Sequence, residues 1–150
     1  MALVHASCVA VDGSGVLLLG PPGSGKSDLA LRLVDGGAVL VADDQVDIRA
    51  VAGRLEAAPP AALAGRIEVR GLGILALDWR ESAPLRLAVE LLVDRRPERL
   101  PAPAERRFQG IALPLIRLAP FDASAAARVR LAARAAAADS AAAPNPENAR

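Results

Sequence analysis

The apolar positions of the chain gather into short runs, and most of these runs are too short for helices. Residues 7–11 and 16–19 are two such runs, and Asp12-Gly13-Ser14-Gly15 joins them, which is a hairpin pattern. Residues 27–34 instead predict a helix, with alternate leucines partly buried and Gly36-Gly37 as its stop. Further strands are expected at 38–42, 46–51, 54–57, 67–69, 74–77, 85–93 and 113–118.

The last third of the chain has a different pattern. Residues 94–107 are dense in charge and proline and predict a mobile loop, whereas the Ala and Arg content of residues 123–139 predicts a helix. Residues 140–150 are expected to form a disordered tail after one domain over residues 1–139. The whole pattern predicts an α/β domain with more strand than helix.

Composition narrows the class of protein. A net charge of +1 and only three aromatic residues in 150 argue against nucleic-acid binding and against an anionic membrane surface. Residues 1–11 carry no Lys or Arg, and Asp12 interrupts the apolar start, so no secretion signal is expected. The single cysteine, Cys8, leaves no internal disulfide and suits a reducing compartment. A cytoplasmic protein is the expectation.

The strongest motif is a glycine-rich loop between a predicted strand and a predicted helix. Its pattern Gly-x-x-x-x-Gly-Lys-Ser turns backbone N–H groups toward an anion, and the helix N-terminus adds its positive end. Lys26 is the only lysine among 18 basic residues, and a compact ammonium can settle between two phosphates where a guanidinium cannot. Lys26 is expected to reach the β- and γ-phosphates of ATP, and the Ser27 hydroxyl to ligate Mg²⁺. The expected nucleotide-binding residues are Gly20, Pro21, Pro22, Gly23, Ser24, Gly25, Lys26 and Ser27.

A protein that binds a nucleotide through such a loop also needs carboxylate oxygen for Mg²⁺ and, if it is a kinase, a group that takes the acceptor's proton. Asp43-Asp44 ends a predicted strand, and Glu68 stands between apolar residues of another. A solvated strand end and a half-exposed strand face would explain these charges equally well. The only histidine, His5, is on its own more often incidental than functional.

Together these segments resemble the HPr kinase/phosphorylase family, in its short form that consists of the catalytic domain alone. The resemblance rests on His5, the loop 20–27, Leu-Val-Ala-Asp-Asp at 40–44, and Ile-Glu-Val-Arg-Gly-Leu-Gly-Ile at 67–74. It implies a fold related to the phosphoenolpyruvate-carboxykinase core. It also implies ATP-dependent phosphorylation of a serine on HPr, or on its nitrogen-system relative, with a reverse reaction that uses inorganic phosphate.

The resemblance also implies roles for single residues. Asp44 resembles the base that accepts the serine proton, and His5 resembles the family's active-site histidine. Glu68 resembles the second protein ligand of Mg²⁺ beside Ser27, and Asp43 would support the metal through water or hold Asp44 in place.

After residue 77 the resemblance is thinner. Glu98-Arg99-Leu100 resembles an acidic-Arg-Leu segment in which the arginine is an active-site residue, although a solvated charge run is an alternative reading of 94–107. The family's Pro-Gly-Arg-Asn-type segment, tied to dephosphorylation, corresponds here to residues 118–124, which lack that arginine. Kinase activity is therefore the firmer expectation, while phosphorylase activity and assembly into a homo-oligomer stay open.

Two other functions fit parts of the pattern. A small-molecule kinase would use the arginines of 95–107 as a lid over the phosphates, but it gives Glu68 no role. A non-catalytic nucleotide-sensing module would need Lys26 but no base, so Asp44 would be dispensable.

Overall fold

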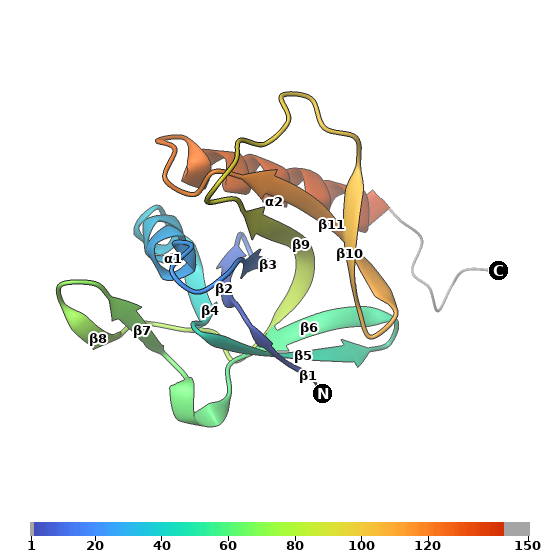
Figure 1. The fold of residues 1–150 in the computed structure, drawn as a ribbon. Helices are drawn as coiled ribbons and strands as arrows, with labels where there is room; N and C mark the ends of the chain where they lie inside the picture. The colour runs from blue at the N-terminus through green and yellow to red at the C-terminus, as the bar shows by residue number, and fades with distance from the viewer. Residues whose placement is uncertain (1, 143–150) are drawn as a thin grey trace.

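A computed structural model describes residues 2–142 of the chain, and it shows one strand-rich α/β unit (Figure 1). Two α-helices occur in these residues, α1 (Lys26–Asp35) and α2 (Ala125–Ala142), together with one short 3₁₀ turn, η1 (Ala61–Leu63). The strands are β1 (Ala2–His5), β2 (Ser7–Val11), β3 (Ser14–Leu19), β4 (Val39–Ala42), β5 (Gln45–Val51), β6 (Arg54–Ala58), β7 (Arg66–Val69), β8 (Gly73–Ala76), β9 (Ala83–Leu91), β10 (Ala104–Phe108) and β11 (Ile111–Leu118).

The long strand β9 is the centre of the main sheet. Its first residues pair antiparallel with β6, and its remainder runs parallel to β3 on one side and to β11 on the other. The sheet has the order β1-β5-β6-β9-β3-β2-β4, and β10 adds to the outer edge of β11. Because β3 is central and leads into α1, the glycine-rich loop sits where a buried strand ends.

At strands β2 and β3, both faces of the sheet are covered. Val9, Val16 and Leu18 face the helices, whereas Cys8 and Leu17 face a second apolar cluster that β5, β6 and β11 complete. Strands that are covered on both faces need continuous apolar runs instead of alternation. This is why the two runs read from the sequence carry no polar residue facing water.

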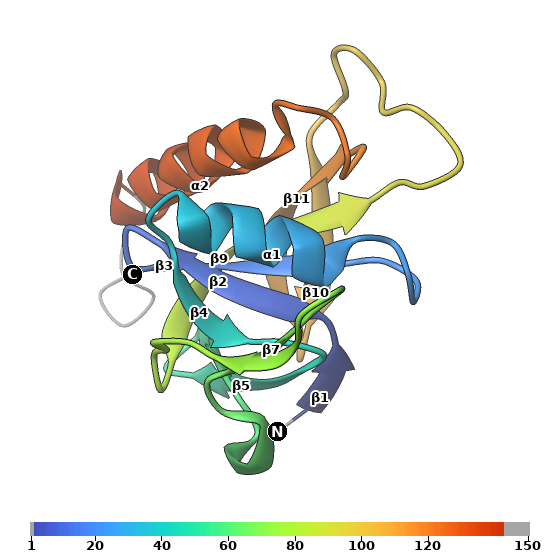
Figure 2. The same cartoon turned by 90° about the vertical axis from the view of Figure 1, so that its left-hand side faces the viewer.

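The two helices lie side by side over the same face of the sheet (Figure 2). Leu29 and Leu33 of α1, and Val129 and Ala133 of α2, enter one core cluster with the strands. Side-chain burial of this kind contributes about 25 cal/mol per Å² of apolar surface. The packing therefore fixes the direction in which α1 presents its N-terminus.

Strands β7 and β8 form a separate two-stranded hairpin beside α1 (Figure 1). Ile67 of β7 is buried in the cluster on the helix side, so it anchors the hairpin. The far end of the hairpin is exposed, including Leu72 and Ile74. The anchored end brings the neighbouring Glu68 backbone toward the end of β4.

The predicted hairpins, the helix after the loop and the strand-rich α/β class are confirmed. The expected loop over residues 94–107 is wrong at its end, because Ala104–Phe108 is strand β10, an edge strand paired with β11. Helix α2 continues to Ala142, so residues 140–142 are helical where a tail was expected, and residues 143–150 lie outside the described residues. Neither helix in residues 2–142 has the length and apolar character of a membrane span.

Candidate functional site

The glycine-rich loop lies between the end of β3 and the start of α1, as its motif predicts. Gly23 and Gly25 have φ angles of 79° and 97°, a left-handed region that glycine enters without steric cost. The Ser24 amide donates a hydrogen bond to the Pro21 carbonyl at 3.0 Å and closes a turn inside the loop. Gly25 is also the N-cap of α1, so the amides at the start of the helix are directed toward the loop.

The Lys26 ammonium is held by the loop itself. Its Nζ donates to the carbonyl oxygens of Gly20 at 2.6 Å and of Pro21 at 3.2 Å. Burial lowers the pKa of Lys26 from its ordinary value, and the charges of Asp44 and Asp43 oppose that shift. The ammonium therefore lies within the electrostatic reach of both aspartates.

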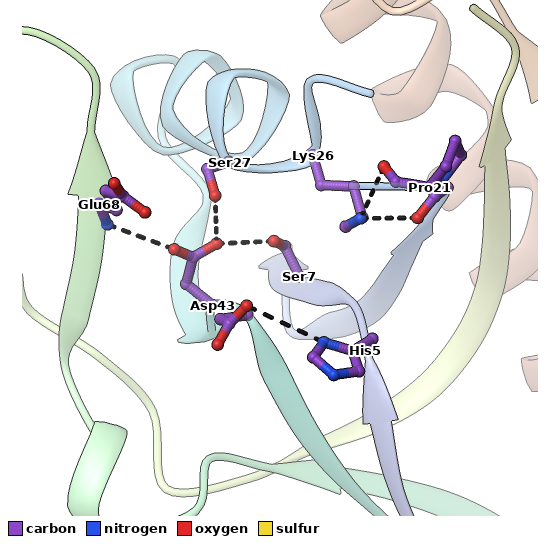
Figure 3. A network of polar contacts seen from close by, with 9 residues as sticks. His5, Ser7, Pro21, Lys26, Ser27, Asp43 and Glu68 are labelled. Carbon is purple, nitrogen blue, oxygen red and sulfur yellow. Dashed lines mark hydrogen bonds and ion pairs between the residues drawn. The ribbon is translucent and has the colours of Figure 1, made fainter. Parts of the chain in front are cut away.

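Asp43 is the centre of a buried hydrogen-bond network (Figure 3). Ser7 Oγ of β2 and Ser27 Oγ of α1 each donate to its Oδ1 at 2.7 Å. The backbone N–H of Glu68 in β7 donates to Oδ2 at 3.3 Å. A charged acceptor with three donors is well compensated for its burial, and it ties β2, β4, β7 and α1 together.

Asp44 has a different environment from its neighbour. Its φ angle is 71°, a left-handed conformation that Asp tolerates better than most residues, in the turn between β4 and β5. Its side chain is 72% exposed, and Oδ1 lies 4.0 Å from Nδ1 of His5, which is 79% exposed. The structure thus brings His5 and Asp44 together at the surface of the network.

The oxygen groups near the loop suit a hard cation. Ser27, Asp43 and Glu68 offer only hydroxyl and carboxylate oxygens, the ligands that Mg²⁺ prefers. Within residues 2–142 no group of three or more His, Cys, Asp or Glu side chains forms a metal cage. Mg²⁺ in nucleotide sites is commonly held by one or two protein groups together with phosphate oxygens and water. Glu68 reaches Asp43 through its backbone N–H, while its side chain is exposed.

A cavity of about 700 Å³ opens beside the glycine-rich loop. Its walls come from the start of the chain, the loop, the end of β9 and β10, and it is lined by Val4, His5, Leu19, Gly20, Pro21, Glu90, Leu91, Leu92, Val93, Asp94, Arg95 and Arg106. Arg95 and Arg106 supply its positive charge. Arg99, the arginine expected in the site, is exposed in the connection between β9 and β10 and does not line this cavity.

Sequence reasoning did not single out Ser7 or Arg106. Ser7 is the polar first residue of a strand that is otherwise apolar on both faces. A hydroxyl buried there requires a hydrogen-bond partner, and this requirement could have identified Ser7 from the sequence. Arg106 was one of several neighbouring arginines. Arg106 and Arg107 both lie in β10, and of these two only Arg106 lines the cavity.

Comparisons with known proteins agree with the resemblance drawn from the sequence. Residues 1–84 match the family model described as "HPr Serine kinase C-terminal domain". A similar curated protein is the HPr kinase/phosphorylase of Clostridium tetani (strain Massachusetts / E88), which is 47% identical over 72 residues, or 48% of this chain. That of Caldanaerobacter subterraneus subsp. tengcongensis is 49% identical over 73 residues. Each match spans 24% of the relative's length.

A solved structure extends the likeness of fold over nearly the whole chain. The Hpr(Ser) kinase/phosphatase from Coxiella burnetii matches with a TM-score of 0.80, covering 94% of this chain and 99% of that chain at 24% identity. At that identity the match supports the fold, including β9, β11 and α2, which lie wholly or mostly beyond the matched residues 1–84. By the match over more than half of its length, the chain belongs to the HPr serine kinase C-terminal domain family.

Proposed function

We propose that the chain is an ATP-dependent kinase that phosphorylates a serine on HPr or on its nitrogen-system relative. The observation that carries the proposal is the Asp43 network, which joins the phosphate-loop serine, Ser27, to the end of β4 and to β7. An ordinary glycine-rich turn needs no such link to a buried carboxylate. The names of the relatives support a phosphocarrier as the substrate.

The loop residues suit the triphosphate of ATP. The Ser24 hydroxyl is buried and has no hydrogen-bond partner within the described residues, and a phosphate oxygen would supply one. Lys26 would exchange the Gly20 and Pro21 carbonyls for phosphate oxygens when the nucleotide binds.

Ser27, Asp43 and Glu68 would hold Mg²⁺, with Asp43 acting directly or through water. Mg²⁺ neutralises charge on the β- and γ-phosphates during transfer. Ser27 donates its proton to Asp43, so a lone pair of its Oγ remains for the ion.

Asp44 is the proposed base. The serine oxygen forms a bond to the γ-phosphorus, the bond from that phosphorus to the bridging oxygen breaks, and ADP leaves with its electron pair. The serine proton passes to the Asp44 carboxylate. A carboxylate suffices because phosphoryl transfer requires positioning and charge neutralisation more than full deprotonation. His5, 4.0 Å away, would orient Asp44.

The reverse reaction would use the same groups. An oxygen of inorganic phosphate would form a bond to the phosphoserine phosphorus, and the bond from that phosphorus to the serine oxygen would break. Pyrophosphate would form, and the serine oxygen would leave with the electron pair and take a proton from the Asp44 carboxyl group. An arginine from the segment after β9 would stabilise the transferring group in both directions. Arg99 is the sequence-based choice, and Arg95 and Arg106 line the cavity.

The wider expectations belong to the same proposal. The fold would be related to the phosphoenolpyruvate-carboxykinase core, and the protein would act in the cytoplasm as a single chain or a homo-oligomer, without nucleic acid or membrane. The cavity of about 700 Å³ is also large enough for a small acceptor, so a small-molecule kinase is the second candidate.

The direct test is to incubate the full chain with ATP, Mg²⁺ and purified HPr, and to measure the mass of HPr. The proposal predicts a gain of one phosphoryl group on a serine, and no gain with Lys26→Ala. If HPr loses this phosphoryl group after inorganic phosphate is added, the protein also catalyses the reverse reaction. An unchanged HPr mass with ATP still bound would favour the small-molecule kinase.

A further inference from the structure

An exposed aromatic ring lies directly against the phosphate loop. Phe121, in the connection between β11 and α2, is 68% exposed. Its ring lies 2.8 Å from the place that a Cβ on Gly25 would occupy, so the ring covers the residue that begins α1. The chain has only three aromatic residues, and this one lies against the loop that is proposed to bind the phosphates.

Phe121 also forms one wall of a second cavity, of about 460 Å³. This volume lies within the range of about 300–1,000 Å³ that small-molecule sites occupy. Residues 92–95 line both this cavity and the one beside His5, so the two meet at the end of β9. The other walls are Arg96 and residues 119–122.

The connection that carries Phe121 is fixed in place on both sides of the ring. Arg96 makes a bidentate ion pair with Asp122 at 2.8 and 2.9 Å, and Arg128 adds a bond at 3.3 Å. Arg32 of α1 donates to the Pro120 carbonyl. The ring is therefore positioned before any ligand binds, which lowers the entropic cost of binding.

We propose that Phe121 is the platform on which the base of the bound nucleotide stacks. This inference rests on the proposed function, since the phosphates are taken to bind at residues 20–27. The rest of the nucleotide then has to leave the loop through one of the two cavities. The two cavities share residues 92–95. The cavity beside His5 adds the charged Glu90 and Arg106, whereas the second cavity adds Ala119, Pro120 and the ring, together with Arg96 and Asp122, which pair with each other.

A wall made of Ala119, Pro120 and an aromatic ring suits the flat face of a purine. Stacking a base on an aromatic side chain is worth about 5- to 100-fold in affinity and does not depend on which base is stacked. We therefore expect similar affinities for ATP and GTP, because stacking contacts the face of a base and does not distinguish its hydrogen-bonding groups.

The test compares two ligands that share phosphates and differ in the base. Dissociation constants for Mg²⁺–ATP and Mg²⁺–tripolyphosphate are measured by calorimetry on the full chain, on Phe121→Ala, on Phe121→Tyr and on Leu131→Ala. Leu131 is a matched control, since it is 65% exposed on α2 and lines neither cavity. Phe121→Ala should weaken ATP about 5- to 100-fold and leave tripolyphosphate unchanged. The Tyr variant and the control should bind both ligands like the parent chain.

Each other outcome overturns the inference in a distinct way. Unchanged ATP affinity in Phe121→Ala, with ATP still bound by the parent chain, would refute the platform and leave the kinase standing. If the affinities for ATP and for tripolyphosphate fall equally, the ring supports the structure of the loop and does not stack on the base. An increase only in the KM for the protein substrate would assign the ring to that partner. Failure of the parent chain to bind either ligand would overturn the proposed function as well.

A second measurement avoids any variant that fails to fold. Nuclear Overhauser contacts between the adenine protons and ring protons are readily assigned in a chain with two Phe and one Trp. Contacts to the Phe121 ring are expected. Contacts to another ring, or to none, would contradict the platform.

Discussion

The region around the phosphate loop and the region that follows β9 hold their charged groups in opposite ways. In the first, Asp43 is buried, and donors from three elements surround it. In the second, the arginines are exposed, and Arg95, Arg96 and Arg107 each pair with a single carboxylate. Buried networks depend on strict geometry, whereas exposed pairs each contribute little stability. The first region therefore holds its carboxylate in a strict geometry, whereas the charged groups of the second stay open to solvent.

The largest loss of phosphoryl transfer is expected from a substitution in the phosphate loop, in the region with the strictest geometry. Lys26→Ala removes the ammonium and should lower phosphoryl transfer by about 1,000-fold or more, since such cations neutralise transition-state charge. Transfer is measured with radiolabelled ATP. Residual transfer near the parent rate would mean that the loop does not hold the reacting phosphates.

The next prediction asks which arginine of the second region stabilises the transferring group, Arg106 or Arg99. Arg106→Ala should reduce transfer by about 100-fold if the cavity-lining arginine stabilises the transferring group. Arg99→Ala, measured under the same conditions, is the matched control suggested by its exposed place outside the cavity. The opposite order of effects would return the role to Arg99, as the family resemblance implies.

A smaller effect tests whether the Asp43 network supports the metal. Ser7→Ala removes one donor to a charged acceptor and should cost about 1.5–3 kcal/mol of unfolding free energy. The same change should raise the Mg²⁺ requirement about 10-fold. Ser14→Ala is the control, because Ser14 is also a buried strand serine but accepts a hydrogen bond from Arg86. An equal change of the Mg²⁺ requirement in both variants would reduce Ser7 to a structural role.

The last prediction concerns the rate at which Cys8 is alkylated, which should be very low in the folded chain. Burial raises the pKa of this thiol to about 12, so it stays protonated at pH 8, and its nucleophilic thiolate is scarce. Cys8 should resist alkylation in the folded chain and react once the chain is unfolded in denaturant, as read by mass spectrometry. Rapid alkylation of the folded chain would show that the face of the sheet opposite the helices opens readily.

The sequence predicted the first region well because its signals are local. The glycine-rich loop, its flanking strand and helix, and the Asp43-Asp44 pair all follow from short patterns. It could not tell which aspartate is buried, because that depends on β2 and β7 packing against the end of β4. The positive φ of Asp44 arises from the turn into β5, which the residues alone did not reveal.

The second region escaped prediction for a physical reason. Strand β10 reads Ala-Glu-Arg-Arg-Phe and lies at an edge, where it pairs with β11, and only Ala104 and Phe108 at its two ends pack against the core. An edge strand of this kind has no apolar alternation to detect. The expectation for 94–107 failed there, and the same lack of pattern left Arg106 undistinguished among its neighbours.

The roles of the two aspartates are separated most directly by Asp44→Asn, because Asn also tolerates the left-handed backbone at this turn. Single-turnover transfer from ATP to HPr and the dissociation constant of Mg²⁺–ATP are measured on the same preparation. We expect transfer to fall about 100- to 10,000-fold while the affinity for Mg²⁺–ATP stays within about threefold of the parent chain. Transfer at the parent rate would contradict the assignment of Asp44 as the base.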